Sequence, residues 1–569
     1  MEPKTGLRRN VAHYGDAEFA AYLRKAFIKA MGYTDEALDR PVVGIVDTGS
    51  GYNACHRNMP DLIEAASRGV MLAGAIPIPF PVISLQESFT HPSTMYLRNL
   101  MAMDAEEMIR AQPMDAVILI GGCDKTVPAL LMGAASADIP AIMLVTGPMM
   151  AGSWRGERLG ACTDCRRFWG RFRAGELDAG EIAQVSDTLA PTIGTCGVMG
   201  TASTMALAVE AMGMMLPGGA SAPAVSSERR RIAEMTGARA VGIAREGLRP
   251  SQVMAPAAFE NAFRTVMACG GSTNAIIHLT AMAGRLGIAV DLATVDRIAR
   301  ETPVLVDLKP SGQGYMEDLH RAGGLAPILR EIRGALRLDA PTISGRTLGE
   351  TLDAAPAPWP QEVVRPSADP VVRGEGMVVL GGNLAPAGAL LKTAAATPAL
   401  LTHRGRAVVF DSLADLAERL DDPDLDVTAE DVLVLRDAGP IGAPGMPEAG
   451  YIPIPKKLAR EGVKDMVRIS DARMSGTAFG TIVLHIAPEA AAGGPLGAVR
   501  TGDMIALDAG GRTLMLEVAP EEIAARLAAR PPREDGETRG YARLYRQSVL
   551  QADRGCDFDF CVPKERARL

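Results

Sequence analysis

The chain has 569 residues, 47% of them hydrophobic, and a formal net charge of −8 at pH 7. It is too long for one core and too apolar for disorder, so we expect two or three packed domains. Because Lys and Arg are scattered and no apolar stretch of about 18 uncharged residues occurs, we expect a cytoplasmic protein that binds neither nucleic acid nor a membrane.

The first half of the chain alternates short β-branched runs with helical segments. Strands are expected at 41–48, 115–122 and 139–147, and helices at about 59–74 and 127–137. Such alternation predicts a parallel sheet covered by helices, and near-continuous apolar strands fit burial on both faces. We therefore expect an N-terminal α/β domain over residues 1–355.

A proline-rich segment divides the chain. Between Asp353 and Pro370 it carries five prolines, which lack backbone donors and prevent regular helix, so residues 356–372 are expected to form a linker. The apolar runs and the hairpin-like segment beyond it predict a β-rich, barrel-like domain over residues 373–569. The end of this domain, rich in Arg and Glu, predicts a surface helix and tail.

Eight cysteines are too few for a disulfide scaffold in so long a chain, so some are candidate ligands. Cys55, Cys123 and Cys196 each lie in a Gly- or Asn-containing turn expected just after a strand. Loops at the carboxyl ends of parallel strands converge, and converging thiolates suit a soft metal or an iron–sulfur cluster. Any single cysteine is more often a small buried apolar residue, but a core thiol does not need Asp124 and Lys125 beside it.

Cys162 and Cys165 form the pattern CTDC, which locally resembles a metal or redox motif. One CxxC is half a zinc site, and no thioredoxin-like context surrounds it. We favour a structural or loop-packing role for this pair, and we leave Cys269, Cys556 and Cys561 unassigned.

Carboxylates that can bind a hard cation occur in three separate segments, at Glu87, Asp124 and Glu448. Mg²⁺ prefers oxygen ligands from a few carboxylates and completes its shell with water or substrate. Taken singly, each of these residues is more often a solvated surface group or a helix cap.

Two further motifs have simple structural interpretations. The run GGSTNAIIHL (270–279) predicts a turn that opens a helix, with His278 on an apolar face and satisfied in the core rather than catalytic. The segment ARMSGT, which contains Ser475, would by itself be a turn, because Ser and Gly are the residues expected there.

The segments GGCDKTVPA and RISDARMSGTAFG (468–480) together resemble the dihydroxyacid dehydratase and phosphogluconate dehydratase family. The agreement continues through YNACHRNMPDL, the Glu87 segment, GTCGVMGTAST, GGSTNAIIHL and GPIGAPGMPE, in family order and over nearly the whole chain. Within that family, the chain is more similar to the sugar-acid dehydratases, such as those for L-arabinonate or D-xylonate, than to the branched-chain biosynthetic enzyme. The features that carry this similarity are the form SDARMSGTAFG, the CTDC segment and the overall length.

The resemblance implies two cofactors and their ligands. A [2Fe–2S] cluster, with one iron incompletely ligated by protein, would be held by Cys55, Cys123 and Cys196. A Mg²⁺ ion would be held by Glu87, Asp124, Glu448 and a carbamylated Lys125, since an unmodified ammonium group has only donors. Ser475 matches the family's proposed base, with Thr477 close enough in sequence to contact the substrate. The implied fold places the site between an N-terminal α/β domain and a C-terminal barrel-like domain, in a homodimer or homotetramer.

The implied reaction is the dehydration of a 2,3-dihydroxy acid, here an aldonic acid, to a 2-keto-3-deoxy acid. The nearest alternative is a branched-chain dihydroxyacid dehydratase, which needs an apolar pocket where a sugar acid needs hydrogen-bond partners. Phosphogluconate is less favoured, since no additional basic phosphate cluster is evident. An alternative of another class is a non-catalytic iron–sulfur redox sensor, for which the carboxylates and Ser475 would be superfluous.

Overall fold

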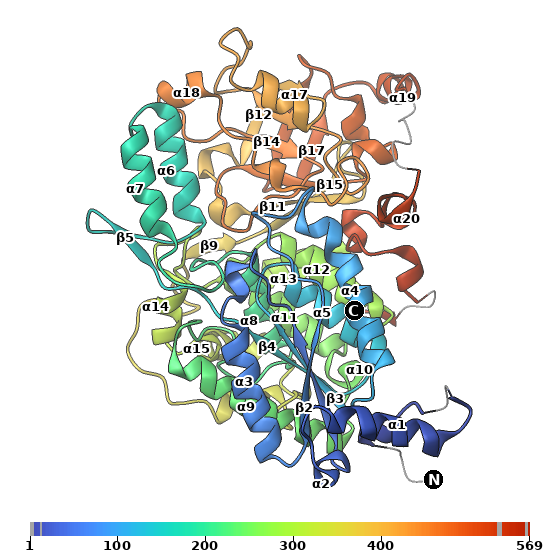
Figure 1. Ribbon diagram of the computed structural model, residues 1–569. Helices are drawn as coiled ribbons and strands as arrows, with labels where there is room; N and C mark the ends of the chain where they lie inside the picture. The colour runs from blue at the N-terminus through green and yellow to red at the C-terminus, as the bar shows by residue number, and fades with distance from the viewer. Residues whose placement is uncertain (1–4, 12–13, 532–537, 564–566) are drawn as a thin grey trace.

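The structure is a computed structural model that describes residues 5–11, 14–531, 538–563 and 567–569. A four-stranded parallel sheet forms the centre of its N-terminal half (Figure 1). In spatial order, its strands are β2 (Ile76–Pro81), β1 (Val42–Asp47), β3 (Ala116–Gly121) and β4 (Ala141–Val145). Every residue of β3 and β4 is buried, which explains their continuous apolar sequences. The expected parallel α/β domain is confirmed.

Helices pack on this sheet in close pairs. The pairs are α3 (Met59–Leu72) with α9 (Ser227–Glu246), and α4 (Thr94–Ala111) with α5 (Thr126–Ala137). A Cβ atom at Gly69 would lie 1.9 Å from the carbonyl oxygen of Glu234, so α3 and α9 approach this closely only because residue 69 is glycine. Two largely buried helices, α8 (Thr201–Ala211) and α12 (Asn274–Arg285), pack against α5, and a third, α11 (Pro256–Ala268), packs against α8 and α12.

The C-terminal half contains an eight-stranded sheet that nearly closes on itself. In spatial order, its strands are β10 (Val378–Leu380), β11 (Gly388–Leu391), β15 (Ile482–Ala487), β14 (Arg468–Ser470), β13 (Val432–Leu435), β12 (Thr402–Phe410), β16 (Met504–Asp508) and β17 (Thr513–Leu516). The two edges meet where the backbone N–H of Leu514 donates to the carbonyl oxygen of Gly381 at 2.8 Å. The expected barrel-like architecture is confirmed.

The proline-rich segment lies between α16 (Leu348–Asp353) and β9 (Val372–Glu375). Within it, Val364 makes an isolated β-bridge with Val306. The N-terminal sheet and the barrel have separate hydrophobic cores. The boundaries expected from the sequence, at 355 and 373, stay a prediction.

The C-terminal segment differs from the expected surface helix and tail, because its last described helix packs against the N-terminal half. In α20 (Gly540–Ser548), Tyr545 is fully buried, and its ring centroid lies 4.8 Å from that of Tyr96 in α4. Farther along, the buried Asp557 forms an ion pair with Arg285 of α12 at 2.5 Å. Aromatic burial and a buried ion pair hold this segment in place, although its overall composition is polar.

One helical hairpin of the N-terminal half stands away from the parallel sheet. It consists of α6 (Thr163–Ala174) and α7 (Ala179–Leu189), and it contacts α18 (Lys456–Arg460) of the C-terminal half (Figure 1). This contact brings residues of α6 to the junction between the two halves. Among the described residues, no helix is long and apolar enough to cross a membrane.

Candidate active site

Loops at the carboxyl ends of the N-terminal strands carry the first group of predicted site residues. Cys55 follows β1, Glu87 follows β2, and Cys123 follows β3, while Cys196 lies in the turn before α8. A hydrogen bond connects the turn before α8 to the Cys55 loop: the N–H of Gly194 donates to the carbonyl oxygen of Ala54 at 3.3 Å. The parallel topology therefore brings these loops to one edge of the sheet.

His56 ties the Cys55 loop to the Cys123 loop. Its Nε2 accepts hydrogen bonds from the backbone N–H groups of Gly122 and Cys123, at 2.9 and 3.0 Å. Its Nδ1 lies 2.9 Å from the carbonyl oxygen of Thr48, which can only accept, so Nδ1 carries the proton. Burial lowers the pKa of His56 to about 4, which keeps the ring neutral and Nε2 an acceptor. The sequence alone gave no reason to single out His56.

The cysteines of the site form two groups, one of two residues and one of three. The thiols of Cys55 and Cys123 are hydrogen-bonded to each other, and this contact, together with burial, raises the pKa of Cys123. The Sγ atom of Cys196 lies 3.3 Å from that of Cys162, and the Cys165 thiol donates to the carbonyl oxygen of Cys162 at 2.6 Å. Thiols from converging loops are a donor set that suits a soft metal or an iron–sulfur cluster. In the described residues, however, the Sγ atoms of Cys55, Cys123 and Cys196 do not all lie within 4.8 Å of one another. The sequence did not indicate that the CTDC segment adjoins this group.

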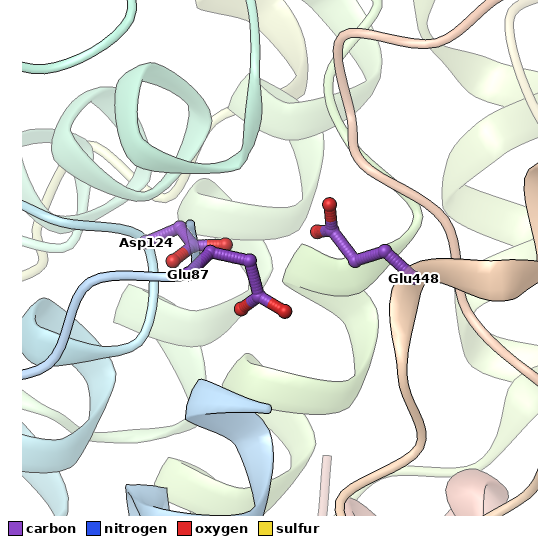
Figure 2. A group of neighbouring side chains, drawn as sticks. All are labelled: Glu87, Asp124 and Glu448. Carbon is purple, nitrogen blue, oxygen red and sulfur yellow. The ribbon is translucent and has the colours of Figure 1, made fainter. Parts of the chain in front are cut away.

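The three predicted carboxylates also come together. One oxygen each of Glu87, Asp124 and Glu448 lies within 4.8 Å of the others. Glu87 and Asp124 come from N-terminal loops, whereas Glu448 begins the short helix η7 (Glu448–Tyr451) of the C-terminal half. Figure 2 shows Glu448 facing the other two side chains from the opposite side. We call these residues the carboxylate trio; their hard oxygen donors fit a divalent cation such as Mg²⁺.

Two fully buried cationic side chains neutralise part of the carboxylate trio. Arg473 donates from Nη1 to Glu448 and from Nη2 to Glu87, both at 2.7 Å. The Nζ atom of Lys125 contacts Asp124 and lies 3.5 Å from Glu87 and 3.8 Å from Glu448. Arg473 lies within the motif RISDARMSGTAFG, but the sequence alone gave it no role.

The electrostatic environment differs between the two glutamates. Burial by itself raises the pKa of Glu87, but the charges of Arg473 and Lys125 outweigh it and hold this pKa at about 2. The pKa of Glu448 is instead raised by burial and by the negative charge of Glu87. A cation bound between these carboxylates would therefore reduce the repulsion between the negative charges of Glu87 and Glu448, which Arg473 and Lys125 only partly offset at Glu448.

Ser475 and Thr477 lie in the turn after β14, with their hydroxyl oxygens 2.8 Å apart. Although the turn belongs to the C-terminal half, two side chains of the N-terminal half donate hydrogen bonds to its backbone. Thr163 at the start of α6 donates to the carbonyl oxygen of Thr477 at 2.8 Å, and Asn274 of α12 donates to that of Met474 at 3.0 Å. The motif GGSTNAIIHL thus opens a helix as expected, and its Asn274 also supports the Ser475 turn.

His278 lies in the interior of α12 with no exposed surface. Its Nδ1 accepts a hydrogen bond from Arg98 at 3.1 Å. Burial, together with the nearby positive charges, lowers the pKa of His278 well below its usual value, so the ring is neutral. The ring is buried, as the sequence suggested, but it is not fully satisfied, because its Nε2 has no hydrogen-bond partner among the described residues.

Arg166 is a further site residue that sequence reasoning missed. It lies on α6, immediately after the CTDC segment. Its Nη1 donates to Thr477 Oγ1 at 3.4 Å, and its Nη2 lies 3.8 Å from Glu448. Adjacency to Cys165 was the only signal in the sequence, and a lone arginine on an amphipathic helix is ordinarily a surface residue.

Comparison with known proteins identifies relatives over the full length of the chain. Two models, for the dihydroxy-acid/6-phosphogluconate dehydratase N-terminal and C-terminal regions, match residues 40–351 and 362–556. The chain is 48% identical to the L-arabonate dehydratase of Azospirillum brasilense, covering 99% of this chain and 98% of the relative. It is 46% identical to the L-arabinonate dehydratase of Rhizobium leguminosarum bv. trifolii, with 97% and 96% covered. It is 45% identical to the 6-deoxy-6-sulfo-D-gluconate dehydratase of Pseudomonas putida, with 92% and 91% covered.

Proposed function

Because the chain belongs to the dihydroxy-acid/6-phosphogluconate dehydratase family, we propose that it is a hydro-lyase that converts an aldonic acid to a 2-keto-3-deoxy acid. The named relatives act on sugar acids and share nearly half of its residues over nearly their whole length. The structural observation that carries the proposal is the carboxylate trio beside the Ser475 turn, at the junction of the two halves. The cytoplasmic setting and the homodimer or homotetramer expected from the sequence belong to the same proposal.

The carboxylate trio, with Lys125 as a carbamate, is proposed to hold Mg²⁺. Formal charges support this assignment, because three carboxylates face the three cationic groups of Lys125, Arg166 and Arg473. A divalent cation adds two positive charges, and carbamylation removes two by turning the ammonium of Lys125 into an anion. The site therefore stays balanced when both changes occur together, which matters because unpaired buried charge is strongly destabilising.

Cys55, Cys123 and Cys196 are proposed to hold the [2Fe–2S] cluster. This assignment is supported by the convergence of three loops, which are connected by the hydrogen bonds of His56 and by the backbone hydrogen bond of Gly194. When bound, Mg²⁺ would offset the negative charge that develops on the substrate's carboxylate and C2 oxygen, while an open iron would make the C3 hydroxyl a better leaving group.

Ser475 is proposed as the base that takes the proton from C2. Thr477 Oγ1 can accept from Arg166 while it donates to Ser475 Oγ, and this order of donation stabilises negative charge on the serine oxygen. The C2 proton would pass to that oxygen, and the electron pair of the C2–H bond would form the C2–C3 double bond of an enol as the C3–O bond breaks. The departing hydroxide would take up a proton and leave as water, and the enol then tautomerises to the 2-keto-3-deoxy acid. Thr477 is the neighbouring hydroxyl that positions the base or the substrate.

The relatives favour a sugar acid over a branched-chain substrate. The three named sugar-acid dehydratases are 45%, 46% and 48% identical to the chain, whereas the dihydroxy-acid dehydratase of Caldicellulosiruptor bescii is 37% identical. A redox sensor would need the thiols but not the carboxylate trio, so this alternative leaves much of the site without a role.

The proposal is tested by assaying the purified, anaerobically handled protein against a panel of aldonic acids and 2,3-dihydroxyisovalerate. We expect a 2-keto-3-deoxy product from at least one aldonate, at a kcat/KM well above that for the branched-chain acid. Turnover of 2,3-dihydroxyisovalerate alone would assign the chain to branched-chain synthesis. A cluster-loaded, Mg²⁺-supplied protein that dehydrates none of these acids would contradict the enzymatic proposal.

A further inference from the structure

The hairpin of α6 and α7 is firmly attached to the C-terminal half. Arg173 at the end of α6 makes two hydrogen bonds to the carboxylate of Asp421, at 2.7 and 2.9 Å, and a third to the carbonyl oxygen of Ile454 at 3.1 Å. The hairpin also has its own small hydrophobic core, in which Phe168 is fully buried. A bidentate Arg–carboxylate pair fixes orientation as well as distance, so α6 is held in one position across the junction.

Arg166 lies one turn into this helix and faces the catalytic groups. Its guanidinium group reaches Thr477 and Glu448 as described above, and it also lies over the ring of Tyr451, 5.4 Å from the centroid. The side chain of Arg166 is 21% exposed, so it is neither a free surface group nor sealed in the core. Three contacts from the C-terminal half thus hold one cationic group beside both the carboxylate trio and the proposed base.

The two arginines of the site differ in how many of their donors are used. Arg473 is fully buried, and its two terminal nitrogens are both committed to carboxylates, at 2.7 Å each. Within the described part of the chain, the side chain of Arg166 makes a single hydrogen bond, the long one to Thr477, while its contact with Glu448 is an ion pair at 3.8 Å. A guanidinium group has five N–H donors, so most of those on Arg166 are available to a ligand.

We propose that Arg166 binds the carboxylate of the substrate and thereby selects acids over neutral sugars. This inference rests on the proposed function, which places an aldonate between the carboxylate trio and Ser475. A planar guanidinium matches a carboxylate in two parallel hydrogen bonds, a geometry that lysine cannot reproduce. When Ser475 takes the C2 proton, the electron pair of the broken C–H bond spreads toward the carboxylate, so the contact with Arg166 strengthens in the transition state.

The test compares an aldonate that the enzyme dehydrates with its neutral aldonamide, in the cluster-loaded, Mg²⁺-supplied protein. For Arg166→Gln, we expect kcat/KM for the aldonate to fall roughly tenfold to a hundredfold, which is the range for a lost hydrogen bond to a charged group. The inhibition constant of the aldonamide should change by less than about threefold, and Arg166→Lys should fall in between. Iron content and visible absorbance should match those of the unsubstituted protein.

Two variants on the same helix separate substrate contact from structure. Arg171 pairs with Glu176 at the surface, so Arg171→Gln should behave as the unsubstituted protein. Arg173→Gln loosens the hairpin and should weaken aldonate and aldonamide alike. An equal loss for both ligands in Arg166→Gln, or no loss for either, would overturn the inference.

The same two ligands in a thermal-shift titration provide a readout that does not need turnover. The unsubstituted protein should be stabilised more by the aldonate than by the aldonamide, and Arg166→Gln should lose that difference. If the unsubstituted protein dehydrates no aldonate yet shows this difference, the proposed function fails and the inference about Arg166 stands. If it is active and Arg166→Gln keeps the difference, only the inference fails.

Discussion

The three cysteines proposed as cluster ligands and the carboxylate trio differ in which parts of the chain supply them. Cys55, Cys123 and Cys196 all come from the N-terminal half, and their loops are joined there by backbone hydrogen bonds and by the neutral His56. The trio takes Glu448 from the C-terminal half, together with the cationic Arg473 that balances it. The proposed cluster ligands are therefore all supplied by one half, whereas the proposed cation site is complete only when both halves have packed together.

This difference means that each centre can be removed without the other. Hydrogen bonds from backbone N–H groups persist when a distant side chain is changed, whereas a balanced set of buried charges responds to the loss of any member. Substitutions in each site test this separation, and the one expected to cause the greatest loss of activity comes first.

The largest effect is expected for Cys123→Ser. Loss of one of three thiolate ligands should remove most of the iron and the visible absorbance, and with them all measurable activity. Iron analysis and the absorption spectrum of the anaerobically purified protein provide the measurement. Cys269→Ser is the matched control, because Cys269 is another buried thiol of the N-terminal half, at the end of α11, and is not one of the proposed cluster ligands. Full iron loading of Cys123→Ser would rule out this ligand set.

A smaller but still large effect is expected for Ser475→Ala. Loss of a general base lowers the rate by about 10²- to 10⁴-fold. A lost positioning hydrogen bond can approach the lower end of this range, so the rate alone does not separate the two roles. The decisive measurement is exchange of the C2 proton with solvent deuterium, which should stop in this variant while iron, Mg²⁺ and substrate still bind. Exchange at a near-normal rate would make Ser475 a positioning residue and mean that another group takes the C2 proton.

The smallest of the three effects is expected for Glu448→Gln, which keeps an oxygen ligand but loses its charge. Activity should fall by roughly 10²- to 10³-fold, because one carboxylate less leaves the cation and Arg473 partly uncompensated. Cluster absorbance should be unchanged, since no thiol is altered. Chelation of divalent cations should reproduce this result in the unsubstituted protein, and added Mg²⁺ should reverse it. Near-normal turnover of Glu448→Gln after chelation would refute the cation site.

The sequence was most informative where local chemistry and fold agree. Apolar β-branched runs alternating with helices predicted the strands β1, β3 and β4, because a strand buried on both faces has a continuous apolar sequence. It was least informative at the C-terminus, where the Arg- and Glu-rich composition concealed a buried Tyr545 and Asp557. Average polarity describes a segment, but burial is decided by a few residues that find partners elsewhere in the fold.

The sequence by itself determined which side chains were candidates, namely three cysteines, three carboxylates, Lys125, Ser475 and Thr477, because motif chemistry is local. Only the tertiary structure decided which of their neighbours complete the site. Arg473 and Arg166 are site residues because packing of the two halves places their charges next to Glu448. Likewise, Cys162 adjoins Cys196 only because α6 folds back toward the turn before α8. Coulombic and hydrogen-bond energies depend on distances of a few ångströms in space, and separation along the chain does not encode those distances.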